Sequence, residues 1–172
     1  MRVMAQLEAE IAGLIREYQA KTGKLLSIGA VESATGGRVA DRITNVPGSS
    51  DYFKGSVVAY SNEVKMALLG VKKATIENYG AVSEETALEM AQGGRKLLDV
   101  DICVSDTGIA GPSGDAPRKP VGLFYLGLAA RDASLSQKHV FPGNREENKR
   151  DAAETALKML KQYLLRYFSS QN

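Results

Sequence analysis

The sequence VESATGGR, residues 31–38, joins a short apolar run to a segment with helical periodicity. Residues 25–31 have the length and composition of a buried strand, whereas residues 37–43 place apolar side chains at Val39 and Ile43, as a helix does. The stretch therefore predicts a strand, a tight turn and a helix. Its two hydroxyls and two glycines exceed what a helix start requires, because a single hydroxyl caps a helix.

The alternation of strand and helix patterns continues along the chain. Strands are predicted over residues 25–31, 55–60, 101–107, 121–130 and 136–141, and helices over 1–23, 37–43, 63–69, 83–98 and 144–168, with a helical turn capped by Thr75 before Gly80. The turn at Arg131-Asp132 predicts that the last two strands form an antiparallel hairpin. We therefore expect one domain over residues 1–172. Its predicted fold is α/β: a three-layer α/β/α sandwich with a mostly parallel, mixed sheet of about five strands.

The last predicted helix opens with Asn144, and Glu147 stands at the position of a capping box. Apolar residues recur along this helix and along the first helix of the chain at helical spacing. The apolar stripes of these two terminal helices are compatible with a homodimer, and equally with burial inside one domain.

Two predicted strands end in loops of small residues, Thr35–Gly37 and Gly108–Asp115. Ligands of α/β sheets bind beyond the carboxyl ends of the strands, where both loops are expected to lie. Backbone N–H groups in such loops can approach an anion closely. Neither a phosphate-binding Gly-Lys-Ser/Thr motif nor the spacing of a dinucleotide fingerprint is present. The first loop is therefore either a structural turn or an anion or oxyanion site.

The amino-acid composition limits the classes of protein to which the chain can belong. The chain has 172 residues with 44% hydrophobic and 24% charged residues, enough for one domain with a full core. With 22 Lys and Arg against 20 Asp and Glu, its net charge of +2 favours neither nucleic acid nor a membrane as partner. Glutamates interrupt the first apolar pattern, so we expect no signal peptide and a cytoplasmic location. The lone Cys103 lies in an apolar run and is expected to be buried.

Candidate catalytic residues are few. His139 is the only histidine and lies in a strand pattern, so it completes a Ser-His-Asp triad only if it reaches the loops. No cluster of residues has metal-ligand spacing, and no metal or other cofactor is expected. Ser33 and Lys65 can form a nucleophile and base if burial or a nearby cation lowers the lysine pKa, whereas an exposed Lys65 has no such role. Arg145 is either a phosphate clamp or a surface residue.

Six segments, in order, resemble the CinA C-terminal domain family. They are ESATGG (32–37), GSSDYFKGSVVAYSNEVKMALLGV (48–71), YGAVSEETA (79–87), TGIAGP (107–112), KPVGLFY (119–125) and FPGNRE (141–146). The resemblance covers about residues 28–160. Members of this family occur alone or fused to the N-terminal domain of the competence/damage-inducible protein CinA, and this chain resembles the stand-alone amidohydrolases.

The resemblance implies hydrolysis of the carboxamide of nicotinamide mononucleotide, which gives nicotinate mononucleotide and ammonia in a pyridine-nucleotide salvage route. It implies that Ser33 is the nucleophile, that Lys65 is the general base and that Tyr60 supplies a supporting hydroxyl. Backbone N–H groups near Gly36 or Gly108 are expected to hold the oxyanion. The implied substrate-binding residues are Glu32, Thr35, Gly36, Gly37, Thr107, Gly108, Ala110, Gly111 and Arg145.

The chain departs from the family pattern at a few positions. Ala34 replaces the family's cysteine, which rules out a cysteine nucleophile there, and Ser113, Asp115 and Arg118 differ from the family pattern in the loop that follows TGIAGP. These departures bear on substrate preference. Two other functions stay open: a nucleotide-binding regulatory or partner-binding module without turnover, and a serine amidase that acts on another small amide.

Overall fold

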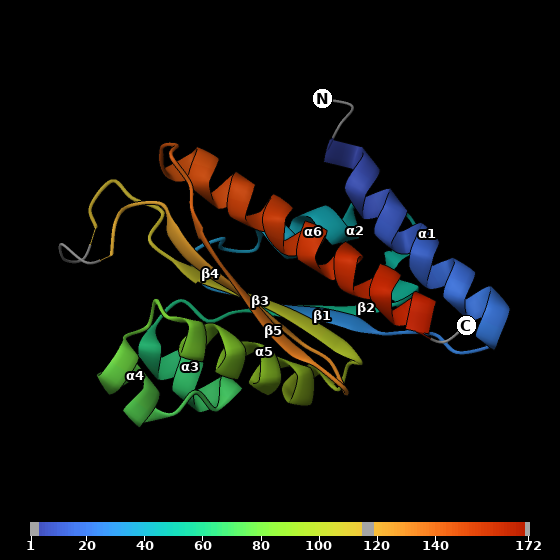
Figure 1. Cartoon of the computed structure of the whole chain (residues 1–172), viewed down its shortest axis with the longest axis horizontal. Coiled ribbons are helices and arrows are strands. Elements are labelled where there is room, and N and C mark those ends of the chain that lie inside the picture. The colour runs from blue at the N-terminus through green and yellow to red at the C-terminus, as the bar shows by residue number, and fades with distance from the viewer. Residues whose placement is uncertain (1–3, 115–118, 171–172) are drawn as a thin grey trace.

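A five-stranded sheet lies between two groups of helices in the computed structural model, which describes residues 4–114 and 119–170 (Figure 1). The helices are α1 (Met4–Thr22), α2 (Arg38–Thr44), α3 (Asn62–Leu69), α4 (Lys73–Tyr79), α5 (Glu84–Leu98) and α6 (Arg145–Ser170), with the 3-10 helix η1 (Ser49–Asp51). The strands are β1 (Ile28–Glu32), β2 (Phe53–Val58), β3 (Ile102–Gly108), β4 (Leu123–Ala129) and β5 (Ser134–Val140). Helices α1, α2 and α6 cover one face of the sheet, and α3, α4 and α5 cover the other. The predicted three-layer sandwich is confirmed.

The order of the strands brings the small-residue loops together. The sheet runs β2-β1-β3-β4-β5, and β1 pairs in parallel with both of its neighbours. Strand β4 is antiparallel to β3 and to β5, so it alone runs in the opposite direction. The carboxyl ends of β2, β1 and β3 therefore meet at one edge of the sheet. The loops that follow β1 and β3 lie next to each other at that edge, as expected for a ligand site.

The sheet separates two hydrophobic cores. The larger lies under α1, α2 and α6 and includes Ile15 and Leu157, which are fully buried. The smaller lies under α3 and α5 and includes Leu69 and Met90. Both cores reach the edge of the sheet at which the parallel strands end.

Helix α5 packs unusually close to its neighbours because two consecutive glycines lie within it. A Cβ atom on Gly93 would lie 1.7 Å from the carbonyl oxygen of Leu69, at the end of α3. One on Gly94 would lie 2.5 Å from Cγ1 of Val31 in β1. A side chain at either position would have to displace these neighbours. The glycine pair therefore sets the position of α3, the helix that carries Lys65.

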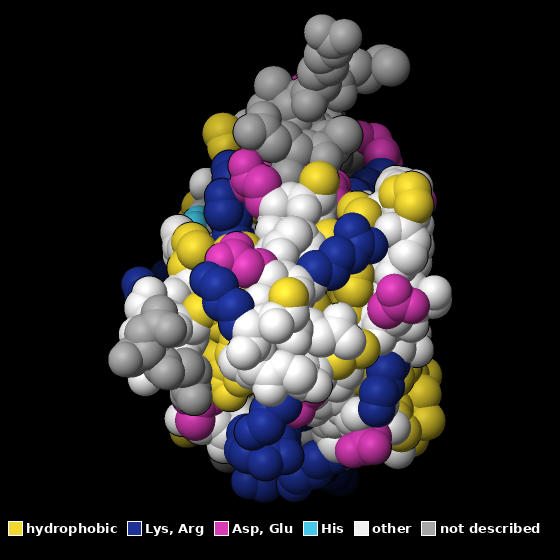
Figure 2. All heavy atoms as spheres, turned by 90° about the vertical axis from the view of Figure 1, so that its right-hand side faces the viewer, with side chains coloured by type: hydrophobic (Ala, Val, Ile, Leu, Met, Phe, Trp, Pro, Cys, Tyr) yellow, Lys and Arg dark blue, Asp and Glu magenta, His cyan; other side chains and the backbone are white. Residues whose placement is uncertain are grey.

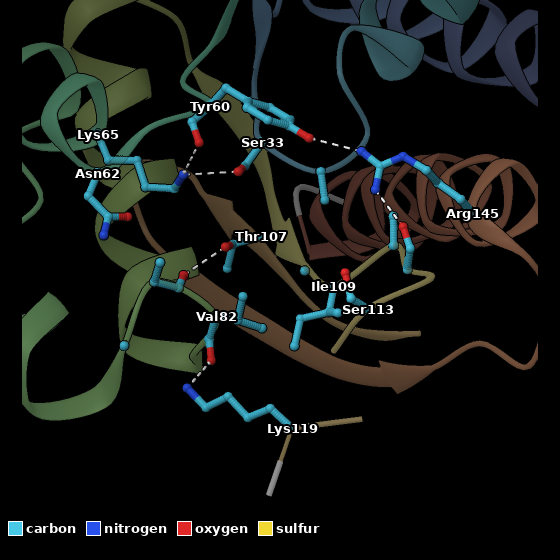
Figure 3. A pocket seen from close by; sticks show the side chains of 16 residues that line it. Ser33, Tyr60, Asn62, Lys65, Val82, Thr107, Ile109, Ser113, Lys119 and Arg145 are labelled. Atoms are coloured by element: carbon cyan, nitrogen blue, oxygen red, sulfur yellow. Dashed lines mark hydrogen bonds between the residues drawn. The ribbon is translucent and has the colours of Figure 1, made fainter. Parts of the chain in front are cut away.

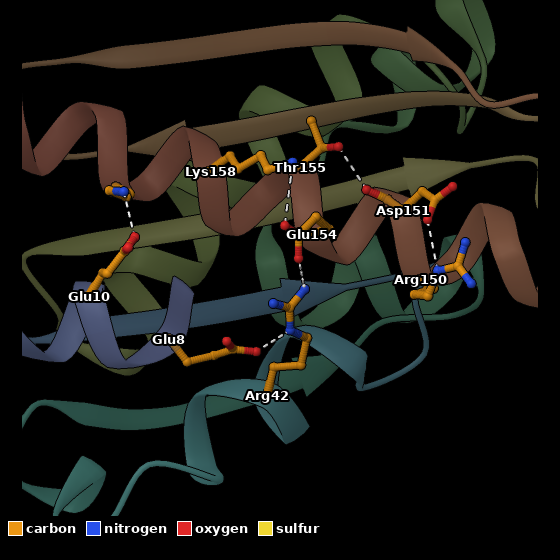
Figure 4. Close-up of polar contacts among 9 residues, drawn as sticks. Glu8, Glu10, Arg42, Arg150, Asp151, Glu154, Thr155 and Lys158 are labelled. Carbon is orange, nitrogen blue, oxygen red and sulfur yellow. Dashed lines mark hydrogen bonds and ion pairs between the residues drawn. The ribbon is translucent and has the colours of Figure 1, made fainter. Parts of the chain in front are cut away.

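A buried ion-pair cluster ties α1, α2 and α6 together (Figure 4). Arg42 of α2 donates through Nε to Glu8 of α1 and through Nη1 to Glu154 of α6, the latter at 2.5 Å. The Arg42 and Glu8 side chains are nearly inaccessible to solvent. Since a buried charge without its partner is costly, each member of the cluster holds the other two in place.

The predicted order of elements is confirmed, with shifted ends. The largest shift is in the first strand, which was expected from Leu25 and begins at Ile28. The prediction that Thr75 caps a helix is wrong, because α4 begins at Lys73. The Thr75 hydroxyl instead donates to Glu89 of α5 at 2.9 Å, which holds α4 against α5. Residues 1–3 of the predicted first helix lie outside the described residues.

The predicted hairpin and capping box are both present. Strands β4 and β5 are joined by a turn in which the N–H of Ala130 donates to the carbonyl oxygen of Ala133. At the start of α6, the N–H of Asn144 donates to Glu147 Oε2 at 2.8 Å, and the N–H of Glu147 donates to Asn144 Oδ1 at 3.1 Å. These reciprocal bonds satisfy two of the free N–H groups at the helix start.

The surface carries no single sign of charge on the face drawn in Figure 2. This face is the end of the molecule at which α1 and α6 finish, and acidic, basic and apolar side chains are interspersed on it, with Lys and Arg gathered at its lower edge. Across the described ranges, every helix is too short or too polar to cross a membrane.

Candidate active site

A cavity of about 640 Å³ opens where β1 and β3 end (Figure 3). Its volume is typical of pockets that hold small molecules. Its walls come from the turn after β1, the β2–α3 connection with α3, the α4–α5 connection and the loop after β3, with the start of α6 at the rim. The described residues that line it are Ser33, Ala34, Tyr60, Asn62, Lys65, Gly80, Ala81, Val82, Thr107, Gly108, Ile109, Ala110, Gly111, Ser113, Lys119 and Arg145.

Ser33 and Lys65 meet in this cavity. Ser33 is the first residue after β1, and Lys65 lies in α3. The lysine Nζ is 2.9 Å from Ser33 Oγ, 2.9 Å from the carbonyl oxygen of Ala59 and 3.5 Å from that of Tyr60. A neutral amine has two hydrogens and one lone pair, so the two carbonyls can take the hydrogens while the lone pair faces the hydroxyl. This is the arrangement of a serine next to a lysine base.

Burial favours the neutral form of Lys65. Its side chain is among the largest that are fully buried, and the residue is 2% exposed. Burial lowers the pKa of Lys65 from its ordinary value of 10.5, whereas the charge of Asp106 acts in the opposite direction. A lowered lysine pKa brings the free amine closer to neutral pH, which a general base requires.

Asp106, near the end of β3, holds the turn that carries Ser33. Its Oδ1 accepts a bond from the Ser33 N–H at 3.0 Å, and its Oδ2 accepts one from the Thr35 N–H at 3.1 Å. The Thr35 hydroxyl also contacts Oδ1. Burial raises the pKa of Asp106 to about 6, Glu32 acts in the same direction, and the bonds from Thr35 and Ser33 oppose them. Asp106 is not predicted from the sequence, because a single aspartate in an apolar strand belongs to no motif.

The carboxylate of Glu32 caps α2 instead of facing the cavity. Its Oε2 accepts bonds from the N–H groups of Gly37 at 2.9 Å and Val39 at 3.1 Å, and its Oε1 accepts one from Ala40 at 2.9 Å. These are N–H groups at the start of α2, which have no partner within the helix. The anion at this helix start is therefore a carboxylate of the chain itself.

Four predicted substrate-binding residues lie outside the cavity lining: Glu32, Thr35, Gly36 and Gly37. The Thr35 hydroxyl lies 2.6 Å from Glu32 Oε2, inside the protein. Gly36 and Gly37 have φ angles of +63° and +100°, which turn the chain into α2 and favour glycine. As placed here, these residues shape the turn, since Glu32 already occupies the N–H groups that an external anion would need.

Tyr60 and Arg145 contact each other at the rim. The Tyr60 hydroxyl accepts a bond from Arg145 Nη2 at 3.0 Å, and Arg145 Nη1 donates to the Gly111 carbonyl oxygen at 2.6 Å. Tyr60 is 61% exposed, and it offers Lys65 its carbonyl oxygen instead of its hydroxyl. Its expected role as a supporting hydroxyl next to Ser33 and Lys65 does not match this orientation, which Figure 3 shows.

The end of β3 and the loop that follows it bring other predicted residues to the cavity. Those that line it here are Thr107, Gly108, Ala110 and Gly111. The Thr107 hydroxyl donates to the Ala81 carbonyl oxygen at 2.7 Å, which ties β3 to the α4–α5 connection. A Cβ atom on Gly108 would lie 2.4 Å from the Phe124 ring, so a glycine is needed at this point.

Several residues that line the cavity are not predicted from the sequence. Lys119 donates from Nζ to the carbonyl oxygens of Tyr79 and Val82, both at 2.7 Å, and so closes one side of the cavity. Residues 79–87 and 119–125 belong to the segments that resemble the family, and this resemblance is the signal that could identify these lining residues. The other missed residues are Asn62, Gly80, Ala81, Val82 and Ile109.

The structure describes two of the four residues that depart from the family pattern. Ser113 lines the cavity, and so does Ala34. Asp115 and Arg118 lie outside the described residues.

His139 and Cys103 lie away from the cavity. The His139 ring stacks on Phe141, and its Nε2 is 3.1 Å from Gln137 Oε1, so no Ser-His-Asp triad forms among the described residues. Burial raises the pKa of the Cys103 thiol to about 12, as expected for an inert core residue. Within the ranges 4–114 and 119–170, no three His, Cys, Asp or Glu residues are grouped as metal ligands.

The fold and the site define an α/β sandwich protein whose cavity holds a buried serine–lysine pair. Residues 6–164 match the CinA C-terminal domain, and the chain belongs to that family. It is 48% identical over 157 residues to a CinA-like protein of Endomicrobium trichonymphae, and 53% identical over 148 residues to a putative competence-damage inducible protein of Halothermothrix orenii. These alignments cover 91% and 83% of this chain, and 36% of each relative. The chain thus spans about a third of the length of these curated relatives.

Solved structures with the same fold cover nearly the whole chain. A competence or damage-inducible protein from Enterobacter asburiae has a TM-score of 0.88 at 26% identity, over 95% of this chain and 99% of that one. The competence/damage inducible protein CihA from Agrobacterium tumefaciens has a TM-score of 0.81 at 35% identity, over 90% of this chain and 93% of that one.

Proposed function

We propose that this chain hydrolyses the carboxamide of nicotinamide mononucleotide to nicotinate mononucleotide and ammonia. The observation that carries the proposal is the 2.9 Å contact between Ser33 Oγ and the buried amine of Lys65, inside a cavity of the size of a small-molecule site. The substrate is suggested by the resemblance of six segments to the amidohydrolases of the family.

In the first half of the reaction, Ser33 Oγ attacks the amide carbon while its proton passes to Lys65 Nζ. The protonated lysine then gives this proton to the amide nitrogen, the C–N bond breaks and ammonia leaves. In the second half, Lys65 takes a proton from water, the hydroxide attacks the ester on Ser33, and the proton returns to Ser33 Oγ. The pyridinium ring of the substrate favours both halves, because its positive charge lowers the lysine pKa and withdraws electrons from the carbonyl carbon.

The N–H of Ala34 is suited to stabilise the oxyanion. In the turn after β1, the N–H groups of Ser33 and Thr35 donate to Asp106, and that of Gly36 donates to the Ser33 carbonyl oxygen at 3.1 Å. The Ala34 N–H has no partner among the described residues, and Ala34 lines the cavity. A donor on the residue after the nucleophile is the position used in nucleophile elbows. Loss of one such donor costs about 3 kcal/mol in the transition state.

The Ser33→Ala variant is expected to lose at least about a thousandfold in the rate of ammonia release, because no other hydroxyl contacts Lys65 Nζ in the described residues. Ammonia release from nicotinamide mononucleotide measures it directly. Ser169→Ala is the control, since Ser169 is an exposed serine near the end of α6, outside the cavity lining, and its replacement is expected to leave the rate intact.

Other outcomes of this assay discriminate between the functions. Wild-type turnover by Ser33→Ala would exclude Ser33 as the nucleophile. Ammonia from other small amides but not from the mononucleotide would indicate an amidase with another substrate. Saturable binding of the mononucleotide without ammonia would indicate a binding module, as in a regulatory role.

Among the described residues, Arg145 and Lys119 are the cations at the rim, and we assign the substrate phosphate to Arg145. Arg145→Met is expected to lower kcat/KM for nicotinamide mononucleotide about tenfold or more, as loss of a charged hydrogen bond does. The same variant should act on nicotinamide riboside, which lacks the phosphate, as well as the wild type does. An equal loss on both substrates would show that Arg145 supports the cavity and does not bind phosphate.

A further inference from the structure

The Thr35 hydroxyl lies between two buried carboxyl groups. Its Oγ1 is within hydrogen-bonding distance of Glu32 Oε2, at 2.6 Å, and of Asp106 Oδ1. All three residues are at most 1% exposed. A hydroxyl has one proton and can donate it to only one of these oxygens. An ionised carboxylate has none to donate, so the second contact requires a proton on one of the two carboxyl groups.

Glu32 accepts more backbone hydrogen bonds than Asp106 does. It accepts three backbone N–H bonds at the start of α2, and both the bonds and the helix dipole favour a negative charge there. Asp106 has two backbone N–H partners and lies in a fully buried site next to that negative charge. Burial in such a site disfavours a second negative charge.

We propose that the Glu32–Thr35–Asp106 cluster holds one proton on the Asp106 carboxyl group. The Asp106 carboxyl donates to Thr35 Oγ1, and the Thr35 hydroxyl donates to Glu32 Oε2. Asp106 Oδ1 still accepts the bond from the Ser33 N–H, because its lone pairs remain available. Asp106 is thus a positioning residue: it orients the turn of the nucleophile as a neutral acid.

The charge of Asp106 affects the pKa of Lys65. The functional meaning of this effect rests on the proposed function, in which Lys65 is the general base. In the part of the chain that the structure describes, two charged side chains interact with Asp106: Glu32 from β1 and Lys65 from α3. Opposite Asp106 in β4 stands Leu126, which is uncharged. An ionised Asp106 stabilises the ammonium form of Lys65, whereas a protonated Asp106 does not. The proton on Asp106 therefore helps to keep the amine neutral.

The test is the titration of the Asp106 carboxyl group in the full chain by NMR with aspartate labelled at the side-chain carboxyl carbon. Asp106→Asn identifies the signal by removing it. The signal is expected to titrate at about pH 6 or above, separate from exposed aspartates, whose ordinary pKa is about 3.9. Titration of Asp106 together with the exposed aspartates would overturn the proposal.

Two variants at Thr35 sharpen the test. Thr35→Ser keeps the hydroxyl and should leave the Asp106 pKa unchanged. Thr35→Val removes the hydroxyl that links Asp106 to Glu32, so the Asp106 pKa is expected to shift from its wild-type value. An unchanged pKa in a folded Thr35→Val variant would show that the hydroxyl does not link the two carboxyl groups. If Thr35→Val does not fold, the wild type and Thr35→Ser decide.

The titration does not depend on catalysis. A raised Asp106 pKa in a chain that releases no ammonia would leave the proton site standing and overturn only the proposed function. An ordinary Asp106 pKa in an active amidase would do the reverse.

Discussion

Replacement of Lys65 by methionine is expected to slow ammonia release from nicotinamide mononucleotide by about a hundredfold to ten-thousandfold, the range that a general base contributes. Methionine fills a similar volume in this buried position, but it has no lone pair that can accept the Ser33 proton. The change therefore separates the chemistry of Lys65 from its packing. Steady-state assays of Lys65→Met and wild type at the same pH measure the effect.

The same variant is expected to alter the pH dependence of folding. Burial lowers the pKa of Lys65 in the folded chain below the ordinary value of 10.5. Between the lowered pKa and 10.5, the unfolded chain binds more protons than the folded chain, so the free energy of unfolding of the wild type rises with pH through this window. Methionine does not titrate, and Lys65→Met should lack this rise.

Urea denaturation at several pH values from neutral up to 10.5 measures this difference. Lys73→Met is a suitable control, because the Lys73 side chain is 79% exposed and its removal should leave the pH dependence as in the wild type. Equal slopes for Lys65→Met and wild type would mean that Lys65 is fully charged in the folded chain, which would contradict its role as a base.

Gly93→Ala is expected to destabilise the fold by about 1–3 kcal/mol, the cost of overpacking a close contact. The sign is the reverse of the usual one, because alanine normally stabilises a helix by about 1 kcal/mol relative to glycine. Here the added methyl group would meet the backbone of Leu69 and push α3 away from α5. Since α3 carries Lys65, ammonia release should fall as well.

Gly13→Ala provides the matched comparison. Gly13 lies within α1, and a Cβ atom there meets nothing within 4 Å. This variant is expected to be more stable than the wild type by about 0.5–1 kcal/mol, with unchanged activity. Midpoints of urea denaturation rank the three proteins. A stable Gly93→Ala variant would show that α3 and α5 can separate without cost.

The layers, the strand order along the chain and the capping box of α6 follow from local sequence. Periodicity reports which face of an element is buried, and the cap residues Asn144 and Glu147 bond to each other within one turn. Such signals are complete within a few residues. The pairing of Ser33 with Lys65 is not a local signal, because it joins two segments 32 residues apart. The sequence therefore offers this pair only as one possibility.

The turn after β1 illustrates where sequence reasoning stops. Small residues before a helix are typical of an anion site, and the anion at this helix start is Glu32, the last residue of β1. Nothing in the pattern distinguishes an internal carboxylate from a bound ligand. Asp106 is 73 residues away from Ser33 in the sequence, and nothing in its apolar strand pattern indicates their contact. The direction of the Tyr60 hydroxyl likewise depends on Arg145, from another part of the chain.

The two halves of the serine–lysine pair are anchored in different hydrophobic cores. Ala34, directly after Ser33, packs into the core under α1, α2 and α6, whereas Leu69, one helical turn after Lys65, packs into the core under α3 and α5. The distance between Ser33 Oγ and Lys65 Nζ therefore depends on how the two outer layers of helices are aligned across the sheet. Misplacement by about 1 Å can cost a hundredfold in rate. A small displacement of one helical layer relative to the other should thus lower the rate of ammonia release even where it leaves the thermal unfolding transition unchanged.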